Sequence, residues 1–202
     1  TPANYFHILR RQLHRSFRKP LMLMTPKSLL RHKMAISDVA DFTTGSSFHR
    51  VLWDDAEKGN SDTKLKPDNK IKRVVMCSGK VYFDLAAEHA EKEIDDIALV
   101  RVEQLYPFPK NDFHEVINRY PNVEEYIWCQ EEPQNQGAWY QIRHHLQNCI
   151  SEGHKLKYVG RPRSASPAVG YHSEHIKEQQ RLVEQAILPA SQRSTTEDDD
   201  DD

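Results

Sequence analysis

Long apolar stretches are missing from this 202-residue sequence. No segment approaches the roughly eighteen apolar residues of a membrane span, and the first residues lack the apolar run of a secretory signal. We therefore expect neither membrane insertion nor secretion by that route. Cysteine is scarce as well, because Cys77, Cys129 and Cys149 stand far apart and form no CxxC pair. This spacing predicts reduced thiols in a reducing compartment.

Several short signatures of catalytic and cofactor sites are also absent. The sequence has no GxGxxG after a strand, no GxSxG, no P-loop spacing and no Gly-Asp-Gly. A dinucleotide fold with the usual fingerprint and an α/β-hydrolase are therefore not supported. The 11 histidines form no HExxH or other metal-ligand spacing, so we expect no metal cluster.

Charge is unevenly distributed along the chain. The net charge is -2, but residues 197–202 read EDDDDD, and without these six the 28 Lys and Arg outnumber 24 Asp and Glu, a balance of +4. Residues 1–37 hold eight Lys and Arg and no acidic residue. Such a block suits nucleic acid, anionic lipid, a phosphorylated ligand or an acidic protein face, and it is equally typical of a solvated face or a domain interface.

The beginning of the chain predicts a helix followed by a strand. Thr1 and Pro2 suit a helix start, and Phe6, Leu9, Leu13 and Phe17 follow at helical spacing. The helix should end before Pro20, and residues 21–24 then read as a short buried strand. A helix with a lone strand is an unfinished unit, so we expect residues 1–32 to be the end of a preceding α/β domain.

The rest of the chain predicts one α/β domain. Residues 33–71 are polar and should form a linker that is partly disordered, and residues 190–202 should form a disordered acidic tail. Between them, at 72–189, strand and helix patterns alternate four times, which indicates a mostly parallel sheet covered by helices. The expected elements are strand 72–77, helix 80–93, strand 97–102, helix 110–119, strand 123–130, helix 137–150, strand 155–159 and helix 172–188.

Loops that follow the strands are where ligands bind in such sheets. In Cys77–Lys80, Ser78 can cap the next helix, Gly79 allows a sharp turn and Lys80 adds positive charge, so an anion could bind, although a plain tight turn explains the same residues. The loop at 103–109 carries two prolines, and we favour a packing role for it.

Two further loops are rich in polar or small residues. In the loop at 130–139, Glu131 and Glu132 can share a proton or hold a cation, or they can pair with basic residues across an interface, which we favour. The loop at 160–172 combines arginines with small residues, which suits close backbone approach to a ligand or partner and suits a surface crossing equally well.

Five strings in these regions resemble the C-terminal end of 2-oxoglutarate dehydrogenase, the thiamine-diphosphate-dependent decarboxylating component of the 2-oxoglutarate dehydrogenase complex. They are MTPKSLLRH (24–32), CSGKVYFDL (77–85), ALVRVEQLYPFP (98–109), WCQEEPQNQGAW (128–139) and GRPRSASPAVGYH (160–172). The resemblance runs from about residue 1 to residue 188, and the related 2-oxoadipate dehydrogenase is the main alternative within it.

The resemblance implies a transketolase C-terminal-like three-layer fold, preceded by the helix and strand of a pyrimidine-binding domain. The whole enzyme would be a homodimer in the mitochondrial matrix or the bacterial cytoplasm. It would use thiamine diphosphate and magnesium to decarboxylate 2-oxoglutarate, and would transfer succinyl to lipoamide on the dihydrolipoyl succinyltransferase component. The residues that perform this chemistry would lie in earlier sequence, so we assign no catalytic, cofactor or metal residue here and expect this portion to be inactive alone.

Its implied roles are packing against the rest of the subunit and the second subunit, and regulation. Members of the family bind nucleotide-type regulators near this domain, and our candidates for an anion site are Lys27, Arg31 and Lys80. Candidate interface residues are Glu131, Glu132, Asn135 and Arg161. A standalone regulatory or scaffold module is the alternative from another class. Nucleic-acid binding rests on the basic block alone, and we expect neither a nucleic acid nor a membrane partner.

Overall fold

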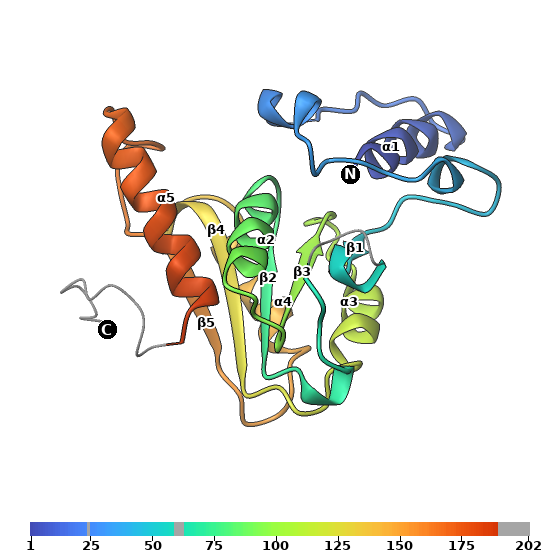
Figure 1. Cartoon of the computed structure of the whole chain (residues 1–202). Coiled ribbons are helices and arrows are strands. Elements are labelled where there is room, and N and C mark those ends of the chain that lie inside the picture. The colour runs from blue at the N-terminus through green and yellow to red at the C-terminus, as the bar shows by residue number, and fades with distance from the viewer. Residues whose placement is uncertain (24, 59–62, 190–202) are drawn as a thin grey trace. The chain divides into compact units, whose positions relative to one another are not determined.

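The computed structural model describes residues 1–23, 25–58 and 63–189, and the chain divides into two compact units, Thr1–Arg50 and the part that begins at Val51 (Figure 1). The expected acidic tail at 190–202 lies outside the described residues, as do Met24 and positions 59–62. No helix within the described ranges is long and apolar enough to cross a membrane.

The second unit is built on a five-stranded sheet with the order β1-β3-β2-β4-β5. Its strands are β1 (Val51–Leu52), β2 (Arg73–Cys77), β3 (Ile97–Val102), β4 (Glu125–Pro133) and β5 (Leu156–Arg161). All neighbouring strands are parallel except β1, which runs antiparallel to β3 at one edge. The carboxyl ends of four strands therefore meet at one edge of the sheet.

Helices cover both faces of this sheet, which makes three layers. The helices are α2 (Val81–Glu91), α3 (Lys110–Ile117), α4 (Trp139–Gln147) and α5 (His172–Ile187). Figure 1 shows α2 and α5 together on one face, and these two helices contact each other. The other face packs against α3 and α4, where Val74, Val100 and Trp128 join Phe113 and Ile142 in one buried cluster. Alternate strand residues point to opposite faces, so both faces of the central strands are apolar.

The four predicted strand–helix repeats are confirmed, and the α/β class with a mostly parallel sheet is correct. Strand 97–102 is reproduced in full, while β4 runs three residues past its predicted end at Gln130, to Pro133. Element ends depend on capping and pairing contacts that a hydrophobic pattern does not encode.

The stretch expected to act as a linker contributes to the second unit. It supplies β1, and Ile71 is 1 % exposed in the core. Just after β1, the Asp54 carboxylate is buried and accepts backbone hydrogen bonds from Leu99 (3.0 Å) and Ala56 (3.0 Å). Asp54 thereby continues the hydrogen bonding of β1 along β3. Strand β1 was not predicted because it is only two residues long and lies in a polar stretch of sequence.

Burial raises the pKa of Asp54 to about 6, and the two backbone N–H donors only partly offset this effect. Because the folded state holds the proton more tightly than the unfolded chain, the contribution of Asp54 to stability falls as pH rises from about 4 to about 6. We expect the free energy of unfolding of the wild type, relative to Asp54→Asn, to decrease across this window and to be flat at higher pH. Urea titrations of both proteins at several pH values measure this, and a difference that rises with pH would contradict it.

The three cysteines are buried as free thiols. Cys77 and Cys129 are register partners on β2 and β4, and burial raises the pKa of Cys77 to about 12. At neutral pH these buried thiols are therefore protonated and unreactive.

The first unit contains α1 (Pro2–His14), which ends well before Pro20. Thr1 caps it by accepting a hydrogen bond from the Asn4 amide (3.2 Å). The strand predicted at 21–24 is wrong for residues 21–23, which form no strand, and Met22 is 81 % exposed.

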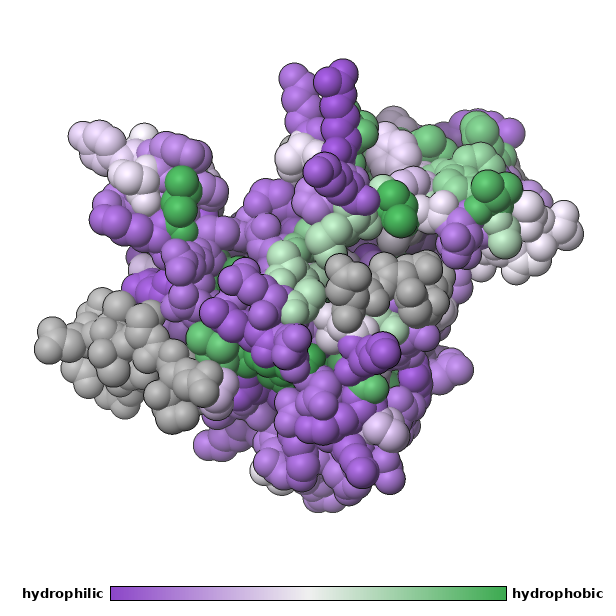
Figure 2. Space-filling model, in the orientation of Figure 1, coloured by the Kyte–Doolittle hydropathy of each residue, from purple (hydrophilic) through white to green (hydrophobic). Residues whose placement is uncertain are grey.

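The buried face of α1 is the polar one, opposite to the usual arrangement. Asn4 exchanges two hydrogen bonds with the backbone of His49 (3.0 and 2.9 Å), and the His7 Nε2 atom lies 2.7 Å from the Asp41 carbonyl oxygen. The residues of the predicted apolar stripe remain exposed, by 39 % to 74 %. They are Phe6, Leu9, Leu13 and Phe17. Figure 2 shows apolar surface in green on the first unit, between hydrophilic side chains.

Candidate functional site

The carboxyl edge of the sheet holds the candidate site residues of the second unit. After β2 the chain turns at Gly79, whose positive φ of 82° suits glycine, and Lys80 directly precedes α2. The expected side-chain cap by Ser78 is absent, since Lys80 occupies the N-cap position without a side-chain hydrogen bond to the helix. Instead, the Lys80 ammonium group forms an ion pair with Glu131 at the end of β4.

Glu131 belongs to a larger network of charged side chains. Gln179 of α5 donates hydrogen bonds from Nε2 to Glu131 (3.0 Å) and to Asp84 of α2 (2.8 Å). Arg161 at the end of β5 donates to the Oε1 atom of Gln179 (3.1 Å). We call this set, with Lys80, the carboxyl-edge network. It ties α2, β4, β5 and α5 together.

Arg161 is the most buried member of the network, with 8 % of its side chain exposed. Its guanidinium group also lies 3.1 Å from Glu178 and 2.9 Å from His175 Nδ1, both on α5. The contact makes Nδ1 of His175 an acceptor, which assigns the ring proton to Nε2. Arg161 therefore fixes the first half of α5 against the sheet.

Gln130 organises the loop that follows β4. Its side-chain carbonyl accepts hydrogen bonds from the Trp128 indole (3.0 Å) and the Trp139 amide (3.1 Å). Its amide group donates to the backbone carbonyls of three loop residues at 2.8 to 3.3 Å. Those residues are Glu132, Pro133 and Gln136. One buried amide side chain thus connects both ends of the loop.

The loops after β4 and β5 are fastened to each other. Asn135 donates to the Ser164 carbonyl (2.9 Å) and accepts from the Ser164 amide (3.0 Å), which is the pairing of two amide groups. Arg163 donates to Gln134 (2.9 Å) and to the Tyr140 hydroxyl (2.9 Å). The two loops form one connected, largely exposed surface.

Close packing of β4 on β5 leaves no room for a side chain at Gly160. A Cβ atom there would lie 2.3 Å from the Tyr158 hydroxyl and 2.8 Å from the backbone oxygen of Gln130. We expect Gly160→Ala to lower the free energy of unfolding by about 2 kcal/mol, because the backbone cannot move aside cheaply. Gly170→Ala is the matched control, since nothing lies within 4 Å of its Cβ position. Equal melting temperatures for the two variants would contradict the prediction.

The candidate interface residues have different surroundings. Glu131 and Arg161 point into the carboxyl-edge network, and Asn135 holds the neighbouring loop. Glu132 is exposed. Successive residues of a strand point to opposite faces, so Glu131 and Glu132 do not form a proton-sharing pair. The arrangement is completed by Gln179, His175 and Gln130. Of these three, only Gln130 lies in a loop where the sequence pattern predicted site residues.

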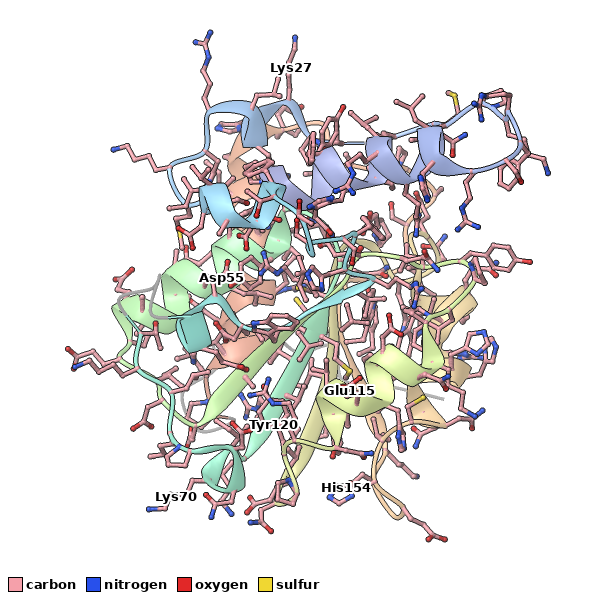
Figure 3. All side chains as sticks on the ribbon, turned by 90° about the vertical axis from the view of Figure 1, so that its right-hand side faces the viewer. Lys27, Asp55, Lys70, Glu115, Tyr120 and His154 are labelled. Atoms are coloured by element: carbon pink, nitrogen blue, oxygen red, sulfur yellow. The ribbon has the colours of Figure 1, made fainter. Side chains whose placement is uncertain are left out.

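The candidate anion-binding residues are divided between the two units. Lys27 and Arg31 begin and end a short 3-10 helix of the first unit, both exposed, and Figure 3 shows Lys27 pointing away from the ribbon. Lys80 lies in the second unit, where Glu131 already neutralises it. An anion at Lys80 would have to displace that carboxylate. Among the described residues, no group of three or more His, Cys, Asp or Glu could hold a metal ion.

Comparison with known proteins identifies the family. The model of the 2-oxoglutarate dehydrogenase C-terminal family matches residues 36–187, which include the whole sheet and all four of its helices. The chain belongs to this family. Proteins named 2-oxoglutarate dehydrogenase E1 component from Brucella ovis and Brucella melitensis biotype 2 are 52% identical to it over 192 residues, and one from Brucella abortus (strain S19) is 52% identical over 193.

The alignments with these relatives cover more of the chain than the match to the family model does. Each covers 93% of this chain but only 19% of the relative's own length. The chain therefore spans about a fifth of the length of the curated relatives it matches.

Proposed function

We propose that this chain acts as the C-terminal portion of a 2-oxoglutarate dehydrogenase E1 component. In the whole protein the reaction would be decarboxylation of 2-oxoglutarate with transfer of succinyl to lipoamide in the tricarboxylic acid cycle. The observation that carries the proposal is the 52% identity over 93% of the chain. Thiamine diphosphate would stabilise the carbanion left by decarboxylation and magnesium would hold its diphosphate, and no residue of this chain is assigned to either.

The role of this portion would be assembly. The exposed stripe on α1 is the kind of apolar surface that another part of a protein covers, and the connected loops after β4 and β5 offer a second, more polar one. We propose the remainder of the subunit and a second copy of the same subunit as the partners of these surfaces. The dihydrolipoyl succinyltransferase component would be the partner of the assembled enzyme, in a bacterial cytoplasm or a mitochondrial matrix.

The test begins with the native polypeptide. An antibody against residues 77–85 is used to isolate it and to determine its mass by immunoblot. We expect a mass several times 23.6 kDa and decarboxylation of 2-oxoglutarate that depends on thiamine diphosphate and magnesium. Faster turnover of 2-oxoadipate would assign the chain to the related enzyme. A native mass near 23.6 kDa without activity would support a standalone regulatory module.

Regulation by an anionic, nucleotide-type ligand is proposed for Lys27 and Arg31, with Lys80 as a further candidate. Both side chains of the first pair are exposed and stand at the two ends of one short 3-10 helix, and cationic side chains of this kind bind phosphate groups. Charge reversal at both positions in the complete enzyme should abolish the response to an activator such as AMP or acetyl-CoA. An unchanged response would remove this assignment.

A further inference from the structure

Two exposed arginines of the second unit have no carboxylate partner, whereas most other arginines of this unit have one. Four arginines lie 2.5 to 3.1 Å from a carboxylate oxygen, namely Arg73, Arg101, Arg119 and Arg161. Arg143 and Arg163 form no such ion pair with any described residue, and both are exposed. Their positive charges are therefore at the surface without a counter-ion.

Both of these guanidinium groups contact the same side chain, that of Tyr140. Arg143, on α4 like Tyr140, places its Cζ atom 4.8 Å from the centre of the tyrosine ring. Arg163, in the loop after β5, donates a hydrogen bond from Nη2 to the Tyr140 hydroxyl (2.9 Å). We call Tyr140, Arg143 and Arg163 the arginine–tyrosine cluster. The shared contact places the two cations on one patch of surface.

The cluster has hydrogen-bond donors that remain available. The Tyr140 hydroxyl accepts from Arg163, and no described residue accepts its own proton. Arg163 uses Nε for Gln134 (2.9 Å) and Nη2 for Tyr140, which leaves Nη1 available. The guanidinium group of Arg143 donates no hydrogen bond within the described part of the chain. A ligand could therefore bind these donors without breaking an existing contact.

The neighbouring acidic residues do not neutralise the cluster. Glu131 forms an ion pair with Lys80, and Glu132 is exposed and pairs with neither Arg143 nor Arg163 in the described structure. The first turn of α4 contains no acidic residue, and its N-cap residue makes no side-chain hydrogen bond to the helix. The positive end of the α4 dipole therefore adds to the two guanidinium charges.

A doubly charged oxyanion matches this set of donors. A guanidinium group presents a planar fork of N–H groups that fits phosphate oxygens, and two such groups balance the charge of a phosphate dianion. We propose that the arginine–tyrosine cluster binds a dianionic phosphate group, either of a small phosphorylated ligand or of free phosphate. The inference does not depend on the proposed enzymatic role, and the cluster includes none of Lys27, Arg31 and Lys80.

The experiment follows amide hydrogen exchange of the native-length polypeptide with and without phosphate. Inorganic phosphate at about 10 mM is compared with sodium chloride of the same ionic strength, so that screening is equal. We expect residues 139–143 and 161–166 to exchange at least about threefold more slowly in phosphate. Amides of β2 and β3 are the reference and should change less, since phosphate also stabilises folded proteins in general.

Two double variants with the same change in charge locate the site. Arg143→Gln/Arg163→Gln should lose the phosphate-dependent protection. Lys70→Gln/Lys155→Gln should keep it, because these exposed lysines precede β2 and β5 at the amino edge of the sheet. Each variant is compared with and without phosphate, so a looser loop does not imitate lost binding. Arg143→Lys/Arg163→Lys keeps the charges without the forks, and should need at least about tenfold more phosphate for the same protection.

Two further probes define the ligand. Phenyl phosphate carries its phosphate on an organic group, so stronger protection than by inorganic phosphate supports a phosphorylated ligand, and equal or weaker protection supports the free ion. Malonate has two singly charged carboxylates and should protect at least about threefold less. The proposal fails if phosphate gives no local protection in the wild type, if the double glutamine variant is protected equally, or if malonate protects as well as phosphate.

Discussion

Replacing Gln130 by Met should lower the free energy of unfolding by about 3 to 4 kcal/mol. The side chain is 2 % exposed and takes part in five hydrogen bonds, two at Oε1 and three from Nε2. Met has a similar volume but cannot accept or donate in this way, so the Trp128 indole and the Trp139 amide would be left buried without an acceptor. Each such orphaned donor costs about 1 to 3 kcal/mol.

The measurement is urea unfolding followed by tryptophan emission, which reports on Trp128 and Trp139 directly. Gln134→Met is the matched control, because Gln134 lies in the same loop but accepts one hydrogen bond, from Arg163, near the surface. We expect that control to cost less than about 1 kcal/mol. If both variants unfold at the same urea concentration, Gln130 does not organise the loop.

The strand and helix order of the second unit was predictable because it depends on local periodicity. Buried apolar runs such as Val74–Cys77 and Ala98–Val100 are typical of central parallel strands, and amphipathic stretches separate them. The two-residue β1 has no period of its own. Its place in the sheet comes from pairing with β3 and from the Asp54 carboxylate, and these are contacts across 45 to 51 positions.

The orientation of α1 was not predictable from its amphipathic pattern. The pattern correctly marks an apolar stripe but does not say which surface covers it, and in the first unit Asn4 and His7 pack inward instead. A hydrophobic stripe predicts burial only where its partner is present. Phe17, the last residue of the expected stripe, lies beyond the end of the helix at His14.

The candidate site was predictable in part, since the marked loops do lie at the carboxyl edge of the sheet. Glu131, Asn135 and Arg161 were identified by their place after strands, but their partners were not. Gln179 contacts Asp84 across 95 positions and Glu131 across 48, and nothing in the local sequence of α5 indicates this. The pattern therefore located the edge, whereas the ion pairs depend on how α2 and α5 pack against each other.

Replacing Arg161 by Met should cost about 3 kcal/mol of stability and loosen the first half of α5. The guanidinium group is the counter-ion of Glu178 and also binds His175 and Gln179, so its loss leaves a partly buried carboxylate without compensation. Breaking such a pair on one side is costly, whereas replacing both partners by apolar residues is often neutral. We therefore expect the double variant Arg161→Met/Glu178→Met to regain at least half of the loss.

Hydrogen exchange distinguishes this effect from a general loss of packing. Amides of residues 175–180 should exchange faster in Arg161→Met than in the wild type. The exchange rates of amides in β2 and β3 should change only as much as the global free energy of unfolding changes. Arg163→Met serves as the control, because Arg163 is exposed and its two hydrogen bonds link surface loops. The role assigned to Arg161 fails if its variant is no less stable than the control, or if the second substitution at Glu178 brings no recovery. Recovery with protected α5 amides in the double variant would show that the uncompensated carboxylate of Glu178, and not a loss of packing, destabilises Arg161→Met.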